Sequence, residues 1–542
     1  MGLTFVAALA VAVLALFWMG QILSSRRKSL RGECPVPGPK GIPLLGNTFQ
    51  LSATPQKQMV QWAREFGEVY RVRLAYNDWY MLNSPEAVKE IMDKNSAVTS
   101  SRTPMPVASD ALSGGMRFLL MPYSPEWRRL RAISHKLLTP KVSDTFQPSQ
   151  EFEAKQLLHD ILTDNLTNAE FYMHIRRYTV SLIMTSTYGQ RVPQWECEEV
   201  REIYKLMEDF SNVAVPGKYL ADTIPPLANI LPESLHWWRK SMMPLQRQQE
   251  KIWMKFWTSL RTQMETGQAP ECFVKQFIES EYEKMGITEL QGAFLAGTMI
   301  EAGSETTSSA LNSGVLYLSA HPDVQSRAHE ELDRVVGQSR LPTFADADQL
   351  PYIRAIAKEI LRVRPVTNMG TPHYTTADVH YKGYCIPKES VVAIQQYAIH
   401  NNPQYFPEPE KFKPERYLSY QHKSGVYAAS ADPHERDHWS FGAGRRICTG
   451  MHLAENSLYI TVAMILWAFN IRPPPGQKAE QVDFSDEAYL PGMNTLPKRF
   501  RAQFIPRTPE IAQLIRTQWG AAKRDGYTLR NVKVDVSGVA ID

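Results

Sequence analysis

Cysteine is scarce in this sequence, and charge of one sign is not in excess. Only five cysteines occur in 542 residues, an odd number and too few for a disulfide scaffold. Sixty Lys and Arg residues against 56 Asp and Glu residues give a net charge of +4. Proteins that coat nucleic acid need concentrated positive charge, so we expect no nucleic-acid partner. Hydrophobic residues make up 43% of the chain, which is typical of a large folded protein.

Charge is absent altogether from residues 1–25. Apolar residues fill nearly all of positions 3–19, and about 20 such residues in a helix span the hydrocarbon core of a bilayer. Basic residues follow at once: Arg26, Arg27, Lys28 and Arg31. A cleaved secretory signal would carry its positive charge before the apolar run. We therefore predict a retained transmembrane anchor, with the rest of the chain in the cytosol by the positive-inside rule.

A basic and proline-rich segment follows at residues 26–47. Four prolines stand within positions 35–43, where fixed φ angles and missing N–H donors exclude a helix or a central strand. We interpret this segment as a stiff hinge, with a disordered spacer as the alternative. Residues 48–505 are expected to form one large catalytic domain, mainly α-helical with small β-sheets, and residues 506–542 a C-terminal extension.

Two regions are expected to form the framework of this domain. Residues 289–320 form the longest helical candidate, which ends before His321-Pro322 and is mostly apolar or small, so we expect it at the centre of the domain. A β-hairpin is expected around Asn77-Asp78, and a second β-rich region at residues 373–397.

Three glycines surround Cys448 in residues 441–450, directly before a final predicted helix at about 450–468. Glycines allow tight turns with positive φ, so this loop can curl closely around another group. The start of the helix favours the thiolate form of Cys448, and a thiolate that accepts backbone hydrogen bonds is a good ligand for haem iron. A buried structural cysteine would explain Cys448, but neither the glycines nor Arg446.

The pattern F-x-x-G-x-R-x-C-x-G in residues 441–450 resembles the haem-binding signature of the cytochrome P450 family. Other family motifs occur in the expected order: Trp127-x-x-x-Arg131, Ala-Gly-Ser-Glu-Thr-Thr at 302–307, Glu359-x-x-Arg362 and Pro414-Glu415-Arg416-Tyr417. The resemblance covers residues 35–505 and implies the cytochrome P450 fold, preceded by one N-terminal transmembrane helix.

The resemblance also implies a cofactor and its ligands. The cofactor is haem b, iron protoporphyrin IX, with the Cys448 thiolate as axial ligand of the iron. Further cofactor-binding residues implied are Trp127, Arg131, His373, Phe441 and Arg446. All but Phe441 are donors suited to the haem propionates, because an unpaired buried carboxylate is costly. Glu359, Arg362 and Arg416 would form an ion-pair triad that holds the Cys448 loop, although the spacing of Glu359 and Arg362 alone fits a surface pair equally well.

Residues of the central helix are implied to be catalytic. Ala302 and Gly303 remove side-chain bulk where oxygen must fit, while Thr306 and Glu305 would pass protons to it. The Thr306 hydroxyl can also hydrogen-bond with the carbonyl four residues earlier. A helix that merely has a Ser/Thr-rich polar face fits the same spacing.

One motif points elsewhere. Residues 434–438, His-Glu-Arg-Asp-His, match the zinc-peptidase pattern H-E-x-x-H, which requires a helix so that both imidazoles share one face. The segment is enclosed by Pro433 and Gly442 and has no apolar stripe. We expect a solvated loop without zinc.

The function implied is that of a cytochrome P450 monooxygenase, which inserts one oxygen atom from O₂ into a lipophilic secondary metabolite such as a terpenoid, polyketide or indole alkaloid. No Rossmann glycine fingerprint is present, so electrons would come from NADPH through a separate NADPH–cytochrome P450 reductase, with cytochrome b5 as a second donor. The anchor implies a single-pass protein of the endoplasmic reticulum membrane. Two alternatives stay open: a haem-thiolate isomerase or dehydratase, against which Glu305-Thr306 argues, and a non-catalytic haem-binding sensor.

The segments expected to line the substrate pocket, by analogy with the family, are largely apolar and carry few charges. They are residues 104–120, 210–214, 294–302, 366–371 and 493–496.

Overall fold

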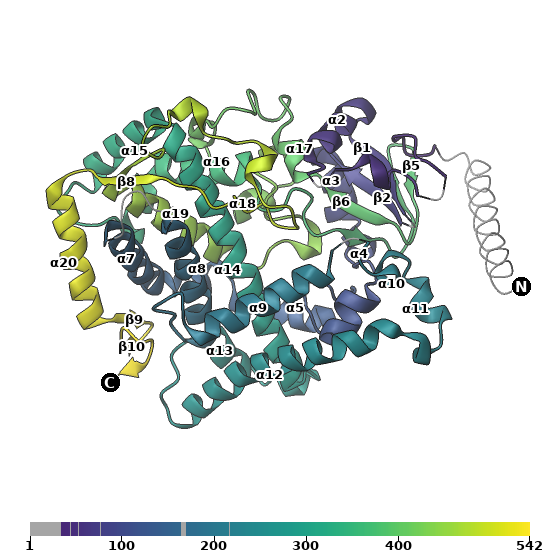
Figure 1. Ribbon diagram of the computed structural model, residues 1–542, viewed down its shortest axis with the longest axis horizontal. Coiled ribbons are helices and arrows are strands. Elements are labelled where there is room, and N and C mark those ends of the chain that lie inside the picture. Colours follow the sequence, from purple (N-terminus) through teal and green to yellow (C-terminus); the bar gives the residue numbers. More distant parts are fainter. Residues whose placement is uncertain are drawn as a thin grey trace, which may run out of the picture.

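A computed structural model describes residues 34–541 except 44, 53, 76, 164–169 and 216. The predicted anchor and the start of the predicted hinge lie outside these residues. Within the described part of the chain, no helix has the length and apolar character needed to cross a membrane. The described chain is mainly helical with small sheets, as predicted, and Figure 1 shows the helices gathered around one long central helix.

The helices vary widely in length. The longer ones are α2 (Gln56–Phe66), α5 (Pro125–Leu137), α7 (Gln147–Thr163), α8 (Phe171–Tyr188), α9 (Glu198–Val213), α12 (Trp237–Glu265), α14 (Glu289–Ala320), α15 (Pro322–Val335), α16 (Pro351–Val363), α19 (Met451–Ala468) and α20 (Pro509–Asp525). The shorter ones are α3 (Pro85–Val88), α4 (Ser96–Thr99), α6 (Pro140–Asp144), α10 (Leu220–Thr223), α11 (Pro226–Ile230), α13 (Phe273–Glu279), α17 (Gln396–His400) and α18 (Ser424–Ala428).

The central helix is α14, which has the bounds that the sequence predicts. It begins with a capping box, because the Thr288 hydroxyl accepts a hydrogen bond from the Gln291 N–H and the Gln291 side chain accepts one from the Thr288 N–H. It contacts α8, α12, α16 and α19. Gly297 lets α12 approach closely, since a Cβ at this position would lie 2.5 Å from the Trp253 ring. Most of α14 is buried, but Ala302 is exposed, so one strip of this central helix is accessible.

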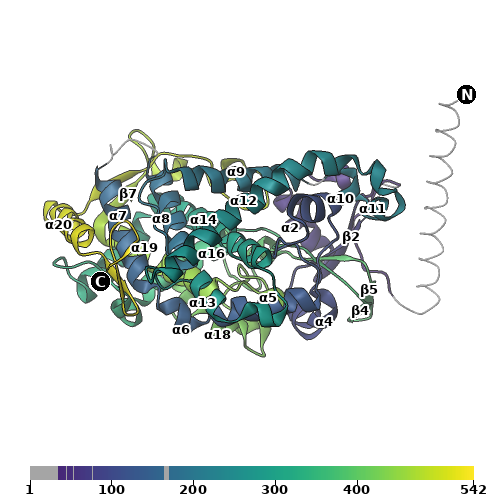
Figure 2. The same cartoon turned by 90° about the horizontal axis from the view of Figure 1, so that it is seen from below.

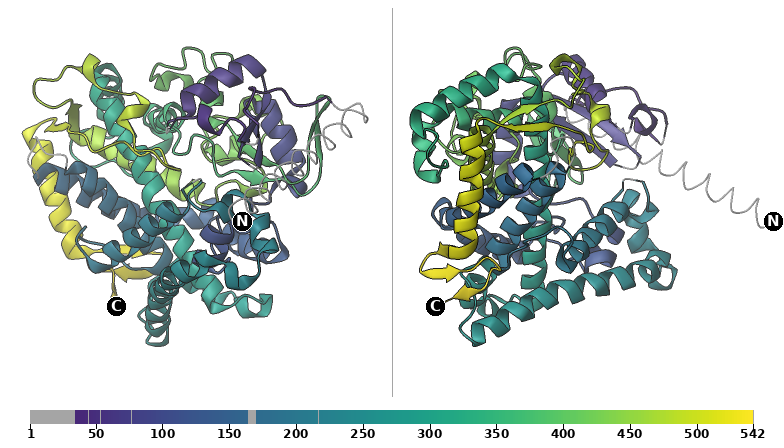
Figure 3. Two further views of the ribbon diagram at one scale, coloured as in Figure 1. Left: turned by 45° about the vertical axis from the view of Figure 1, so that its right-hand side comes forward. Right: turned by 60° about the vertical axis from the view of Figure 1, so that its left-hand side comes forward.

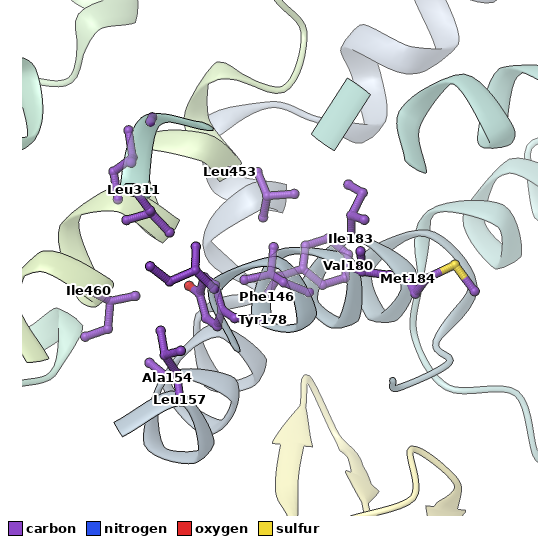
Figure 4. Close-up of a cluster of buried hydrophobic side chains, with 14 of the residues drawn as sticks. Phe146, Ala154, Leu157, Tyr178, Val180, Ile183, Met184, Leu311, Leu453 and Ile460 are labelled. Atoms are coloured by element: carbon purple, nitrogen blue, oxygen red, sulfur yellow. The ribbon is translucent and has the colours of Figure 1, made fainter. Parts of the chain in front are cut away.

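The hydrophobic core lies between α7, α8, α14 and α19. Figure 4 shows part of it, where Leu157, Tyr178, Leu311, Leu453 and Ile460 lie together. Each of these side chains is at most 5% exposed. Burial of apolar surface on this scale is the main stabilising contribution to folding, and it holds α14 rigidly in the centre.

Four strands form the largest sheet, in the order β1 (Val69–Leu74), β2 (Asn77–Leu82), β6 (Val391–Ile394), β3 (His373–Tyr374). The predicted hairpin is confirmed, but Asn77 and Asp78 belong to strand β2 and not to the turn. The turn includes Ala75, at φ 50°. Asp78 lies opposite Arg73 on β1, and their side chains form an ion pair at 2.8 Å that favours this register.

The remaining strands form small sheets. These are β4 (Val379–Tyr381) with β5 (Tyr384–Ile386), β7 (Phe469–Arg472) with β8 (Gln503–Pro506), and β9 (Tyr527–Leu529) with β10 (Val532–Val534) and β11 (Ala540–Ile541). Strands β3 to β6 confirm the predicted β-rich region. The sheet that contains β1 and β6 lies at the opposite end of the molecule from α20 (Figure 1).

The C-terminal segment packs on the domain. Helix α20 and strand β9 contact α7, and Figures 2 and 3 show α20 along one edge of the molecule. Phe152 on α7 contacts Trp519 and Tyr527, with ring centroids 5.4 and 4.8 Å apart. The Arg191 guanidinium donates a hydrogen bond of 2.6 Å to the Val536 carbonyl. Residues 506–541 therefore contribute to the main core; the predicted domain boundary itself stays a prediction.

Substitution of Ile515 tests this contribution. Its side chain is 1% exposed on α20, so Ile515→Ala should lower the free energy of unfolding by about 2–5 kcal/mol. Gln513→Ala, at an exposed position of the same helix, should change it by less than about 0.5 kcal/mol. Denaturant unfolding of both variants measures the difference. Equal effects would show that α20 is not part of the cooperative core.

Candidate active site

The loop that carries Cys448 is closed by backbone hydrogen bonds. The Cys448 N–H donates to the Phe441 carbonyl at 2.9 Å. Gly442 and Gly444 have φ of 72° and 65°, as their predicted role requires. Gly444 also lies against Met92, because a Cβ at this position would be 2.3 Å from the Met92 carbonyl oxygen. Only glycine fits here.

The Cys448 side chain is exposed, yet burial raises the pKa of its thiol. An accessible sulfur that is surrounded by protein lies in a recess and not on an open surface. The Gly450 N–H at the start of α19 and the charge of Arg131 both lower the pKa, but burial outweighs them. The sequence predicts that the helix start favours the thiolate; the Gly450 N–H does lower the pKa of Cys448, but burial outweighs it. Coordination to a metal ion deprotonates a thiol outright.

Basic and aromatic residues from three parts of the chain meet next to this loop. The Arg446 guanidinium lies 3.8 Å from the centre of the Trp127 ring, and Arg131 on α5 donates a hydrogen bond to the Ile447 carbonyl. His373 on β3 is buried and forms a hydrogen bond of 2.7 Å with the Thr99 carbonyl. The structure thus brings together Trp127, Arg131, His373 and Arg446, as the family resemblance implied.

Arg102 belongs to the same cluster and was missed by the sequence analysis. It is buried, and its guanidinium donates to the carbonyls of Leu119, Thr371 and Pro372. No motif or periodicity marks this residue, and only its position before the predicted lining segment 104–120 could have drawn attention to it.

This cluster of cations fits an anionic ligand with two carboxylates. Burial and the neighbouring guanidinium groups lower the pKa of Arg102 to about 9 and that of Arg446 to about 8. Burial and the same arginines hold the pKa of His373 well below its usual value. Within the described residues, no carboxylate forms an ion pair with Arg102, Arg131 or Arg446, and the buried Trp127 Nε1 has no hydrogen-bond acceptor. Buried cations without an anion are strongly unfavourable, and the two propionates of haem would compensate them.

The predicted triad is confirmed. Glu359 and Arg362 on α16 are fully buried and form two parallel hydrogen bonds of 2.7 Å. Arg416 lies 3.1 Å from the same carboxylate, which also accepts a hydrogen bond from the Lys413 N–H. The remaining donors of Arg362 bind the carbonyls of His400, Pro409 and Lys411. The surface-pair alternative is therefore excluded.

The H-E-x-x-H segment does not form a zinc site. Only Pro433–Glu435 is helical, as a short 3-10 turn. His434 is exposed beside Glu86, whereas His438 is buried, so the two imidazoles do not share a face. The expectation of a solvated loop was wrong for its second half. Asp437 is 1% exposed and pairs at 2.5 Å with Lys358 on α16, which draws this half of the segment into the core.

The accessible strip of α14 contains the predicted catalytic pair. Thr306 donates a hydrogen bond of 2.6 Å to the Ala302 carbonyl, so its single proton is engaged and its lone pairs are free to accept. The Glu305 carboxylate accepts a hydrogen bond of 2.7 Å from the Asn494 side chain. Asn494 was missed as a partner, because a contact between residues 189 positions apart leaves no local sequence signal.

Comparison with known proteins agrees with this geometry. The family model for cytochrome P450 matches residues 36–501. The chain is 43% identical over 508 residues to the cytochrome P450 monooxygenase pgmC of Aspergillus terreus, covering 93% of this chain and 92% of the relative. It is 39% identical over 493 residues to the cytochrome P450 monooxygenase verL of Clonostachys rogersoniana, with 90% of each chain covered.

A third relative, cytochrome P450 monooxygenase 69 of Postia placenta, is 35% identical over 560 residues, covering 96% of this chain and 97% of the relative. The chain belongs to the cytochrome P450 family. It is an oxidoreductase that incorporates oxygen from O₂, a cytochrome P450 monooxygenase, and its family binds haem b through a cysteine thiolate.

Replacement of Cys448 tests the assignment of the iron ligand. Cys448→Ala should abolish the red-shifted Soret band of the ferrous–CO complex, because no other described cysteine lies in this loop. The matched controls replace the remaining cysteines by Ser, one at a time, and each should keep the band: Cys34, Cys197, Cys272 and Cys385. An unchanged band in Cys448→Ala would refute the assignment.

Glu359→Gln should impair assembly of the site. It leaves the positive charge of Arg362 buried without a carboxylate, which typically costs about 3–5 kcal/mol. The control is Glu408→Gln in the loop that Arg362 and Arg416 fasten, whose exposed pairs with Lys411 and Lys413 are screened by solvent and should contribute little. The ratio of Soret to protein absorbance reports the haem-loaded fraction. A fully loaded Glu359→Gln protein of unchanged stability would contradict this prediction.

Proposed function

We propose that this cytochrome P450 inserts one oxygen atom from O₂ into a lipophilic secondary metabolite, with electrons supplied from NADPH by a separate reductase. The observation that carries the proposal is the cluster of one buried and two half-buried arginines, Arg102, Arg131 and Arg446, without carboxylate partners beside the accessible Cys448. Such a cluster is unfavourable unless a dianionic group such as haem occupies the neighbouring recess.

The predicted cofactor-binding residues have two roles: most would contact the haem, and one closes the loop that carries Cys448. Cys448 would ligate the iron, and the propionates would be held by the donors Arg102, Trp127, Arg131 and Arg446. One ring nitrogen of His373 donates to the Thr99 carbonyl, so His373 would donate to a propionate only once the neighbouring anion favours protonation of its second ring nitrogen. Phe441 closes the loop, since its carbonyl accepts the Cys448 N–H. When bound, haem supplies the reductive cleavage of O₂ and the transfer of one oxygen atom to the substrate.

Thr306 and Glu305 would manage protons on the accessible strip of α14. The Thr306 hydroxyl is oriented by the Ala302 carbonyl, so its oxygen can accept a proton from water and pass its own proton on. Asn494 holds one oxygen of the Glu305 carboxylate and leaves the other free for exchange with solvent. This acid–alcohol pair supports monooxygenation over a haem-thiolate isomerase, a dehydratase or a non-catalytic sensor, none of which needs protons for the reduction of O₂.

We also propose that the protein is anchored by residues 1–25 in the endoplasmic reticulum membrane, with a second apolar contact. Large apolar side chains are exposed on α10, α11 and the start of α12, among them Ile230 at 75% and Trp237 at 58%. These helices lie at the end of the molecule that also holds the β1–β2 hairpin (Figure 2). Such exposed apolar patches are typical of membrane contacts.

Deletion of residues 1–25 should therefore release only part of the protein from membranes, while the haem spectrum is unchanged. Further replacement of Ile230 and Trp237 by Ser should release the remainder, measured by sedimentation of membranes. Complete release by the deletion alone would refute the second contact, and loss of haem would refute a separable anchor.

The electron donor is proposed to dock near the Cys448 loop. Arg128 and Arg129 on α5 and Arg445 in the loop are exposed and carry positive charge. Such a basic surface would attract an acidic flavoprotein, NADPH–cytochrome P450 reductase, and cytochrome b5 as a second donor. Double replacement of Arg128 and Arg129 by Ser should slow reduction of the haem at low ionic strength more than at high ionic strength.

The experiment that tests the function supplies NADPH, reductase and a panel of terpenoids, polyketides and indole alkaloids to the membrane-bound enzyme. Incorporation of one atom of ¹⁸O from labelled O₂ into a product, read by mass spectrometry, is the expected result. A rearranged or dehydrated product without label would indicate the isomerase or dehydratase alternative. Haem binding without any NADPH consumption beyond that of reductase alone would indicate the sensor.

Thr306→Ala should uncouple the reaction. Haem binding and NADPH consumption should be largely retained, while product per NADPH falls and hydrogen peroxide rises, because loss of a proton donor typically slows the assisted step by about 10²–10⁴-fold. Glu305→Gln should slow turnover, with a deficit that shrinks as the pH falls and solvent protons replace the lost acid. The control is Thr307→Ala, one residue along α14 and buried away from the accessible strip. Unchanged coupling in Thr306→Ala would remove the proton-delivery role.

A further inference from the structure

A buried ion pair interrupts the lining that the sequence analysis expected to be largely apolar. Arg117, in the loop before α5, donates a hydrogen bond to the Glu301 carboxylate on α14. The side chains are 4% and 12% exposed. The Arg117 guanidinium also lies 3.8 Å from the centre of the Phe210 ring on α9. Three of the expected lining segments, 104–120, 210–214 and 294–302, therefore meet at this pair.

Gln249 on α12 completes the cluster. Its side-chain oxygen accepts hydrogen bonds from Arg117 at 3.4 Å and from Ser113 at 3.2 Å. Gln249 is fully buried. Contacts with Glu301, Gln249 and the Phe210 ring therefore fix the orientation of the Arg117 guanidinium.

Two polar atoms of this cluster have no partner. The second carboxylate oxygen of Glu301, Oε1, is a buried acceptor without a donor, and the amide nitrogen of Gln249, Nε2, is a buried donor without an acceptor. Burial raises the pKa of Glu301 although Arg117 opposes the shift. Each unsatisfied atom costs free energy, which a bound ligand or water would recover. One free atom is an acceptor and the other is a donor, and both side chains accept hydrogen bonds from Arg117 through their other polar atom.

The cluster adjoins the accessible strip of α14. Glu301 directly precedes Ala302, whose side chain is exposed, and successive residues of a helix are separated by about 100° around its axis. Part of the Glu301 side chain is accessible. The Glu301 side chain therefore borders the strip on which Ala302 and Thr306 lie.

We infer that Glu301 binds a hydroxyl group of the substrate, whose O–H donates to its carboxylate, while the buried Gln249 holds Arg117 and thereby positions Glu301. This inference rests on the proposed monooxygenase site and adds a specificity-determining contact to it. The substrate class narrows from any lipophilic metabolite to a lipophilic scaffold that already carries an alcohol or phenol group. The enzyme would then act after a reaction that supplies that hydroxyl group.

Two other roles of the cluster make different predictions. A purely structural pair that fastens the loop before α5 to α14 would affect stability but not the choice between ligands. A water molecule that bridges the two free atoms would satisfy both and leave no preference for a hydroxyl group.

Equilibrium binding to the haem-loaded protein tests the inference without turnover. The probes are matched pairs with and without one hydroxyl group: naphthol and naphthalene, anthrol and anthracene, androstanol and androstane. Affinity is read from quenching of the protein's tryptophan fluorescence and from the shift of the Soret band. In at least one pair the hydroxylated member should bind about tenfold or more tightly, the factor that a hydrogen bond to a charged group provides.

Glu301→Leu should reduce this advantage to less than about twofold, and Glu301→Gln, which keeps hydrogen-bonding capacity without charge, should leave an intermediate advantage. The control is Asp486→Asn, which removes the charge from another buried ion pair, with Arg364 at 2.8 Å, and should leave the wild-type preference. Equal affinities within every pair, or an advantage that persists in Glu301→Leu, would overturn the inference. The ferrous–CO spectrum of each variant separates this result from a failure of the haem site itself.

Discussion

The buried carboxylate of Glu359 is the interaction on which the geometry of the site depends. A charge removed from water must be compensated, and here the compensation comes from Arg362, Arg416 and the Lys413 N–H. The two arginines also fix the backbone of residues 400–411, because their remaining N–H groups donate to carbonyls of that segment. The loop after α17 is thus fastened to α16.

The same anchoring extends to the Cys448 loop. The Trp439 N–H donates to the His400 ring, and the Ser440 hydroxyl donates to the Leu361 carbonyl on α16. Asp437, paired with Lys358, adds a second buried ion pair to α16. One helix therefore holds the segment that leads into Cys448, and the position of the sulfur depends on these compensated charges.

How much of this could be predicted from the sequence depends on the range of the contact. Glu359 and Arg362 are three residues apart on one helix, and the glycines around Cys448 reveal the turns they allow, so local pattern was sufficient. Arg102, Asn494 and the Arg117–Glu301 pair join segments far apart in the chain, and no periodicity records which residues will meet. The burial of His438 escaped prediction for a related reason: its polar neighbours resemble a surface loop until Lys358 supplies the partner that draws Asp437 inward.

The binding sites differ from the rest of the structure in that some of their buried charges and polar atoms lack a protein partner. Around Glu359 every charge has its partner, whereas Arg102, Arg131 and Arg446 form no ion pair with any described carboxylate. An unsatisfied atom alone is weak support for a ligand, since buried groups such as the Tyr188 hydroxyl also lack a partner and lie in the apolar core. Glu301 differs because its carboxyl group is ion-paired yet partly accessible, and because it adjoins the exposed strip of α14. The same physical criterion that indicates the haem propionates therefore indicates, at a second place, a substrate group that is polar but neutral.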